Sequence, residues 1–134
     1  MTPDAPRILV ADDDPALRPL ISVICKHLGF LCDGAPDGEV ALEKIRSGHY
    51  DVVLLDLMMP KINGREVIEA LRELPKRPAV IVLTAQNLKK TEGIVDGNVV
   101  HAVIQKPFDL AELTALLTDL APAVHKARKQ QATK

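Results

Sequence analysis

The chain has 134 residues, enough for one domain with a buried core and too few for two. Its formal net charge is −1 and only 2% of its residues are aromatic, so we expect no nucleic-acid partner. No stretch is long enough to span a membrane, and the N-terminus lacks the charged and apolar regions of a signal peptide. These features predict a cytoplasmic protein without membrane insertion.

The first part of the chain alternates apolar runs with segments of helical periodicity. Residues 8–11 and 52–55 are consecutive aliphatic residues, which is typical of strands buried on both faces. Residues 30–32 predict a shorter strand. Residues 17–28 and 37–47 repeat apolar side chains every three or four positions, as amphipathic helices do.

The same alternation continues to the end of the chain. A third helix is predicted around residues 67–71, strands at 79–83 and 99–104, and a last helix at 109–120. Residues 86–98 stand where a fourth helix belongs, but their glycines weaken it, so we expect this segment to be short or mobile.

This alternation predicts an α/β fold, with a doubly wound five-stranded parallel sheet and helices on both faces. The domain is expected to span residues 6–121. The basic extension over residues 122–134 is expected to be frayed and solvated.

Polar side chains follow four of the predicted strands. Right-handed crossovers place the carboxyl ends of parallel strands at one edge of the sheet. The side chains expected there are Asp12, Asp13, Asp14, Asp56, Thr84 and Lys106. Clustered carboxylates favour a hard cation such as Mg²⁺ or Mn²⁺, and a hydroxyl and an ammonium suit the oxygens of a phosphoryl group. Asp56 is then a candidate nucleophile towards phosphorus.

Each of these residues has a more ordinary interpretation when taken alone. Asp14 before Pro15 is more often a helix cap, Thr84 a strand-end residue, and Lys106 a solvated lysine. Their coincidence at the ends of different strands favours a site.

The chain resembles the receiver domain of two-component response regulators over about residues 6–121. The segments that carry the resemblance are residues 8–14, residues 51–60, Gly64, residues 83–85 and Lys106-Pro107-Phe108. It implies a flavodoxin-like fold with strand order 2-1-3-4-5. It also implies a cis peptide bond before Pro107.

The resemblance implies that Asp56 accepts a phosphoryl group from the phosphohistidine of a histidine kinase or phosphotransfer protein. Mg²⁺ would be held by Asp13, Asp56 and the backbone carbonyl of Met58, with Asp12 acting through water. Thr84 would bind the phosphoryl group and Lys106 would pair with it.

The chain departs from the family pattern at the switch. Val103 stands where the family has an aromatic residue that couples to Thr84. His101 lies two residues earlier, and strand alternation predicts that it points to the same side. We therefore expect an order–disorder response in residues 86–98 in place of an aromatic rotation.

Met58 and Gln86 occupy positions that tune phosphate lifetime in the family. A methionine cannot orient an attacking water, so we expect slow self-dephosphorylation.

The function expected is a phospho-accepting switch, with no enzyme activity beyond its own phosphorylation and slow dephosphorylation. Nothing after residue 121 is long enough for an output domain, so the signal is expected to pass to a partner protein from a monomer or weak dimer. The Met1 start favours a stand-alone regulator, while a phosphate shuttle and a fragment of a hybrid kinase also fit.

Three other classes of protein share part of this pattern. A pseudo-receiver that only binds partners is favoured by Val103 and disfavoured by the intact acids and lysine. A phosphatase of the haloacid dehalogenase type would use Asp12-x-Asp14, but Pro15-Ala16 replaces its usual Gly and Thr. A flavodoxin-like nucleotide binder is disfavoured because the acidic loop would repel phosphate without metal.

Overall fold

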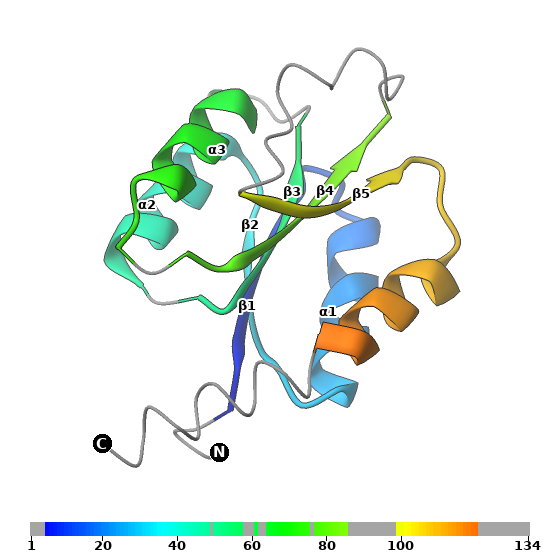
Figure 1. The fold of residues 1–134 in the computed structure, drawn as a ribbon. Helices are drawn as coiled ribbons and strands as arrows, with labels where there is room; N and C mark the ends of the chain where they lie inside the picture. The colour runs from blue at the N-terminus through cyan, green and yellow to red at the C-terminus, as the bar shows by residue number, and fades with distance from the viewer. Residues whose placement is uncertain are drawn as a thin grey trace.

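The computed structural model describes residues 5–48, 50–57, 61, 64–75, 77–85 and 99–120. Its centre is a five-stranded parallel sheet in the order β2-β1-β3-β4-β5 (Figure 1). The strands are β1 (Arg7–Ala11), β2 (Leu31–Ala35), β3 (Val52–Asp56), β4 (Ala79–Thr84) and β5 (Val100–Gln105). Both the parallel sheet and the predicted strand order are confirmed.

Helices cover both faces of the sheet, as predicted. Helices α2 (Gly38–Ser47) and α3 (Gly64–Arg72) lie on one face. Helix α1 (Leu17–His27) and the helix over residues 110–120 lie on the other (Figure 1). No helix of the described part of the chain is long and apolar enough to cross a membrane.

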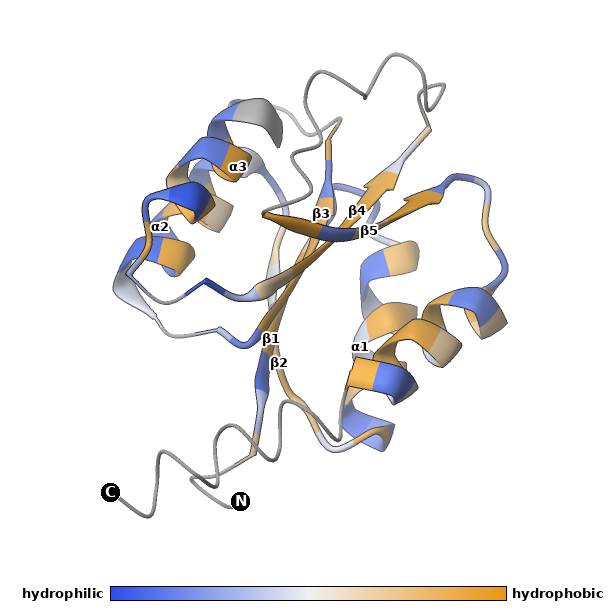
Figure 2. Cartoon of the chain, in the orientation of Figure 1, coloured by the Kyte–Doolittle hydropathy of each residue, from blue (hydrophilic) through white to orange (hydrophobic). Residues whose placement is uncertain are grey.

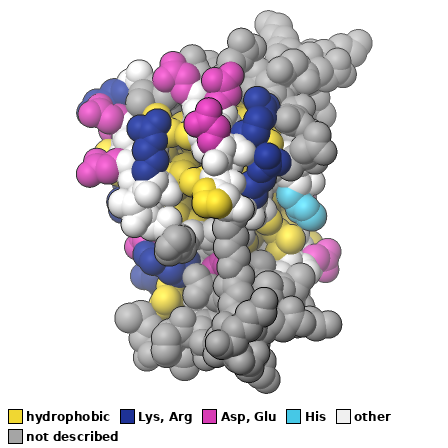
Figure 3. All heavy atoms as spheres, turned by 60° about the vertical axis from the view of Figure 1, so that its left-hand side comes forward, with side chains coloured by type: hydrophobic (Ala, Val, Ile, Leu, Met, Phe, Trp, Pro, Cys, Tyr) yellow, Lys and Arg dark blue, Asp and Glu magenta, His cyan; other side chains and the backbone are white. Residues whose placement is uncertain are grey.

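The core consists of two aliphatic layers, one on each face of the sheet. Within β1, Leu9 and Ala11 join the cluster under α2 and α3, while Ile8 and Val10 join the cluster under α1 and residues 110–120. Alternation along a strand sends successive side chains to opposite faces, and here both faces are covered, which explains the unbroken apolar runs. The apolar sides of the helices therefore face the sheet (Figure 2). Acidic and basic side chains intermix on the side of the molecule that carries α2 and α3 (Figure 3).

Strand β2 is displaced from its predicted position. The sequence predicted a strand over residues 30–32, whereas β2 runs from Leu31 to Ala35. Phe30 lies in the turn that follows α1, where its N–H donates to the carbonyl of Cys25 at 2.9 Å. Asp33 and Gly34 have low strand propensity but pair with Leu9 and Val10 of β1. Tertiary pairing outweighs local preference here.

Strand β5 contains an irregularity that affects His101. Val100 pairs with Val80, whereas Ala102 pairs with Ile81, so His101 has no position in the ladder. Val100 and Val103 consequently reach the same core cluster although they are three residues apart. The simple alternation that placed His101 on the side of Val103 is therefore interrupted, and the His101 side chain is exposed.

Two predicted segments lie outside the described residues. These are residues 86–98 and the extension over residues 122–134. The domain limits of 6 and 121 remain predictions.

Asp33 ties three segments together at the edge of the sheet formed by β2. Its Oδ2 accepts from the Tyr50 hydroxyl at 2.8 Å and from Nη2 of Arg7 at 3.1 Å. Burial alone would raise the pKa of Asp33, but the bonds from Tyr50 and Arg7 outweigh it and hold that pKa below its ordinary value. Burial and the Asp33 charge raise the pKa of Tyr50 to about 12, so the phenol remains a donor at neutral pH.

We expect Tyr50→Phe to lower the free energy of unfolding by about 0.5–1 kcal/mol at pH 7, because Asp33 loses a hydrogen bond. A carboxyl whose pKa is depressed by folding contributes stability above its unfolded pKa and loses it as pH falls through its folded pKa. The difference between variant and wild type should therefore shrink at about pH 3. Urea unfolding at the two pH values measures it, and an equal difference at both would contradict the role of Asp33.

Candidate functional site

Three carboxylates converge where β1 and β3 end. Asp12 and Asp13 follow β1, and Asp56 is the last residue of β3. One ligand oxygen from each lies within 4.8 Å of the other two. Asp12 is 0% exposed and Asp56 3% exposed, whereas Asp13 is exposed to solvent. The predicted acidic cluster is thus present and has an open side at Asp13.

Lys106 supplies the positive charge of this cluster. Its Nζ donates to Oδ2 of Asp12 at 2.8 Å and to Oδ2 of Asp56 at 3.2 Å. Burial would lower the pKa of Lys106, but the hydrogen bond to Asp12 and the charges of both carboxylates outweigh it and raise that pKa. The ammonium is therefore fully charged at neutral pH. The Lys106–Pro107 peptide bond is cis, as the resemblance implied.

Thr84 lies at the same edge of the sheet. It ends β4, is 0% exposed, and its carbonyl accepts from the backbone N–H of Lys106 at 2.7 Å. In the register between β3 and β4, Asp56 pairs with Leu83, the residue before Thr84. The acids, the hydroxyl and the ammonium predicted at the strand ends are therefore brought to one edge.

The residues at this edge fit a divalent cation. Lys106 pairs with two of the three carboxylates that the described residues group here, and grouped like charges are costly unless a cation lies among them. Carboxylate oxygens with an open side suit Mg²⁺, which usually keeps several waters and takes a substrate phosphate as a further ligand. Met58 and Gln86 lie outside the described residues, so the predicted carbonyl ligand and the lifetime positions remain predictions.

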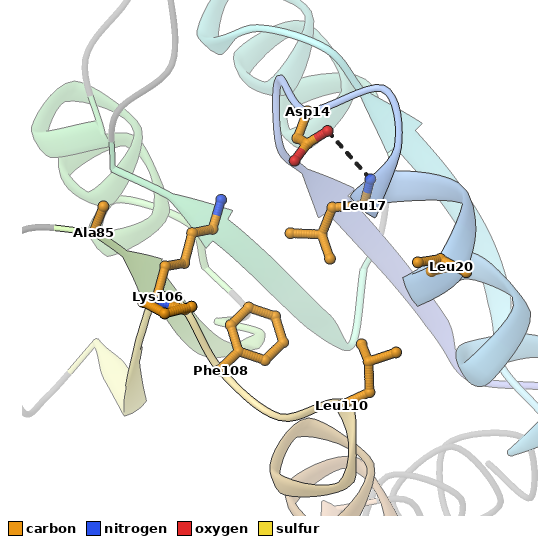
Figure 4. Close-up of a pocket in the computed structure, with 8 residues that line it drawn as sticks. Asp14, Leu17, Leu20, Ala85, Lys106, Phe108 and Leu110 are labelled. Atoms are coloured by element: carbon orange, nitrogen blue, oxygen red, sulfur yellow. Dashed lines mark hydrogen bonds between the residues drawn. The ribbon is translucent and has the colours of Figure 1, made fainter.

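The Asp14 carboxylate is not one of the three clustered carboxylates and bonds the backbone at the entry to α1. Its Oδ1 accepts from the backbone N–H of Ala16 at 2.9 Å and of Leu17 at 3.3 Å, the latter drawn in Figure 4. This satisfies N–H groups that the first helical turn leaves without partners. Asp14 therefore accepts from two N–H groups at the entry to α1, but the N-cap residue of this helix is Ala16, which makes no side-chain capping bond.

A groove of about 540 Å³ opens beside the cluster. Leu17 and Leu20 of α1 line one side, and Phe108 and Leu110 line the other, with Lys106 at one end (Figure 4). Along α1, Leu20 and Val23 are 52% and 66% exposed. A macromolecule bound in this groove would meet apolar side chains next to the Lys106 ammonium.

The two remaining switch candidates, Val103 and His101, lie on β5. Val103 packs against the core cluster under α2 and α3, whereas His101 is exposed. Their predicted role in the switch stays a prediction.

Arg18 was not recognised from the sequence, although it contacts the acidic loop. Its Nη1 donates to the carbonyl of Asp12 at 2.9 Å. A basic residue in the first turn of the helix that follows an acidic loop was the available signal.

The comparisons with known proteins agree with this geometry. Residues 8–118 match the family described as response regulator receiver domain. The transcriptional regulatory protein DltR of Streptococcus agalactiae serotype III (strain NEM316) is 38% identical over 111 residues, which are 81% of this chain and 49% of that protein. Response regulator ArlR of Staphylococcus saprophyticus is 37% identical, with the same shares covered. The chain spans about half the length of these curated relatives.

Solved structures give the same result. Response regulator protein TrrA from Thermotoga maritima, in complex with Mg²⁺ and BeF, has a TM-score of 0.74 and 36% identity, covering 86% of this chain and 98% of that one. The receiver domain of Francisella response regulator 1452 has a TM-score of 0.73 and 30% identity, covering 91% of this chain and 98% of that one. This chain belongs to the response regulator receiver domain family.

Proposed function

We propose that this protein is a cytoplasmic phospho-accepting switch of a two-component system. Asp56 takes a phosphoryl group from a phosphohistidine on a histidine kinase or phosphotransfer protein, and the phosphorylated domain signals to a partner protein. The observation that carries the proposal is the buried Asp56 carboxylate, which lies 3.2 Å from the Lys106 ammonium and beside two further carboxylates.

In this proposal, Mg²⁺ binds Asp13 and Asp56, and Asp12 acts through water. When bound, the metal neutralises the carboxylates and the phosphoryl oxygens. Lys106 holds its proton and pairs with a phosphoryl oxygen, while the Thr84 hydroxyl donates to another. The Asp56 carboxylate attacks phosphorus and forms an acyl phosphate as the bond to the histidine nitrogen breaks. The apolar groove beside Lys106 suits a protein donor.

The proposal includes no enzyme activity beyond the domain's own phosphorylation and slow dephosphorylation. The second candidate is a pseudo-receiver or phosphate shuttle that acts through protein–protein binding. Val103 favours it, because the half-buried valine at the switch position has no aromatic ring to rotate.

Acetyl phosphate tests the proposal. We expect a phosphate adduct by intact mass when Mg²⁺ is present and no adduct in EDTA, because three carboxylates otherwise repel the donor. Beryllofluoride with Mg²⁺ should perturb the amide of Asp56 even if hydrolysis is fast. Absence of both the adduct and beryllofluoride binding would reject phosphorylation and favour the pseudo-receiver.

A further inference from the structure

We propose that Arg18 is a positioning residue for the metal site, acting from α1 on the backbone of the acidic loop; this inference rests on the proposed function of that site. The half-buried Arg18 side chain donates from Nη1 to the carbonyl oxygen of Asp12 at 2.9 Å. This hydrogen bond reaches the main chain, not a ligand carboxylate, so its effect on the ligands passes through the backbone.

The Asp12 carbonyl matters because it belongs to the peptide unit that leads into Asp13. A peptide unit is planar, so the direction of the Asp12 carbonyl fixes the direction of the Asp13 N–H and the position of the Asp13 Cα. Asp13 is the exposed member of the acidic cluster and lacks the burial that holds Asp12 and Asp56. A donor on the preceding carbonyl therefore restrains the ligand that has least support from packing.

The acidic loop is held from two sides. The Asp12 N–H donates to the carbonyl of Ala35 at 3.1 Å, which ties it to β2. The Asp14 N–H donates to Oδ1 of Asp12 at 2.9 Å. Arg18 adds the opposing contact from α1, so the two peptide units that flank the Asp12 Cα are held by a strand and a helix. Groups that orient metal ligands in this way commonly change metal affinity by about 10- to 100-fold.

Gly34 on β2 leaves room for the arginine. A Cβ added at Gly34 would lie 3.2 Å from Cδ and 3.5 Å from Nε of Arg18. Gly34 does not have the positive φ that would by itself favour glycine. Close approach of the Arg18 stem therefore explains the glycine at this position, and the contact from Arg18 to Asp12 depends on residues from two elements.

The Arg18→Ala variant distinguishes a positioning role of Arg18 from a purely electrostatic effect of its charge on Mg²⁺ binding. Removing a positive charge close to the cluster should by electrostatics alone tighten Mg²⁺ binding. Loss of positioning should instead weaken Mg²⁺ binding by about tenfold. Calorimetric titration with MgCl₂ measures the affinity. Arg18→Lys should recover only part of it, because the ammonium lacks the planar guanidinium fork. Lys26→Ala is the matched control, with the same charge change in the last turn of α1.

Two further measurements keep the inference separate from the proposed function. In metal-free protein, hydrogen exchange at the Asp14 amide should be faster in Arg18→Ala than in wild type or Lys26→Ala. Gly34→Ala should weaken Mg²⁺ binding by about threefold in wild type and have no further effect in Arg18→Ala. Unchanged or tighter Mg²⁺ binding in Arg18→Ala would overturn the inference. Faster Asp14 exchange in a protein whose wild type fails to bind Mg²⁺ would support the positioning and reject the proposed metal site.

Discussion

Replacing Asp56 with asparagine is expected to abolish the phosphate adduct and to stabilise the metal-free protein. The amide cannot form the acyl phosphate, so acetyl phosphate and Mg²⁺ should leave the mass of the variant unchanged. Stability should rise because Asp56 is 3% exposed and lies close to Asp12 and Asp13. Removing one of three like charges while preserving side-chain shape relieves repulsion by about 1–2 kcal/mol.

The two effects of Asp56→Asn are measured by intact mass and by urea unfolding in EDTA. The matched control is Asp119→Asn, which neutralises an exposed carboxylate on the helix over residues 110–120 and should change neither. Mg²⁺ should stabilise wild type more than Asp56→Asn, because the variant has lost one ligand. A phosphate adduct that persists in Asp56→Asn would show that another residue is the phosphoacceptor. Lower stability of Asp56→Asn than of wild type in EDTA would mean that the pairing of Asp56 with Lys106 outweighs repulsion among the carboxylates.

The strand order and the edge that carries the site could be predicted because each depends on a local pattern. Four aliphatic residues before Asp56 favour a strand buried on both faces, and in a parallel sheet such a strand ends beside its neighbours. The grouping of Asp12, Asp56, Thr84 and Lys106 follows from that topology, although these residues are far apart in sequence.

What could not be predicted depends on contacts between distant elements. Gly34 lies in a strand against its own propensity because β1 pairs with it. The irregularity at His101 follows from the pairing of β5 with β4, which alternation along one strand cannot reveal. The contact of Arg18 with the Asp12 carbonyl requires the helix to lie over the strand end, so no spacing rule identified it.

Lys106→Met is expected to have the opposite effect to Asp56→Asn on the metal-free protein. The Lys106 side chain is 20% exposed, and its ammonium contacts Asp12, whose side chain is 0% exposed. Removing it leaves a buried carboxylate without its cation, and breaking a buried pair in this way costs about 3–5 kcal/mol. We expect a loss at the lower end of this range, because partial exposure of Lys106 weakens the pair.

Adding Mg²⁺ and adding a second substitution both test whether the loss of stability in Lys106→Met comes from the uncompensated Asp12 charge. Saturating Mg²⁺ should recover part of the stability of Lys106→Met, because a divalent cation again faces the carboxylates. Asp12→Asn combined with Lys106→Met should cost less than the sum of the single changes, because the buried Asp12 charge that Lys106 compensates is then absent. Urea unfolding in EDTA and in Mg²⁺ provides both comparisons, with Lys26→Met as the control on an exposed lysine of α1. If Lys106→Met were as stable as wild type in EDTA, the Lys106–Asp12 pair would contribute nothing to folding stability. Lys106 would then act only in the phosphorylation of Asp56.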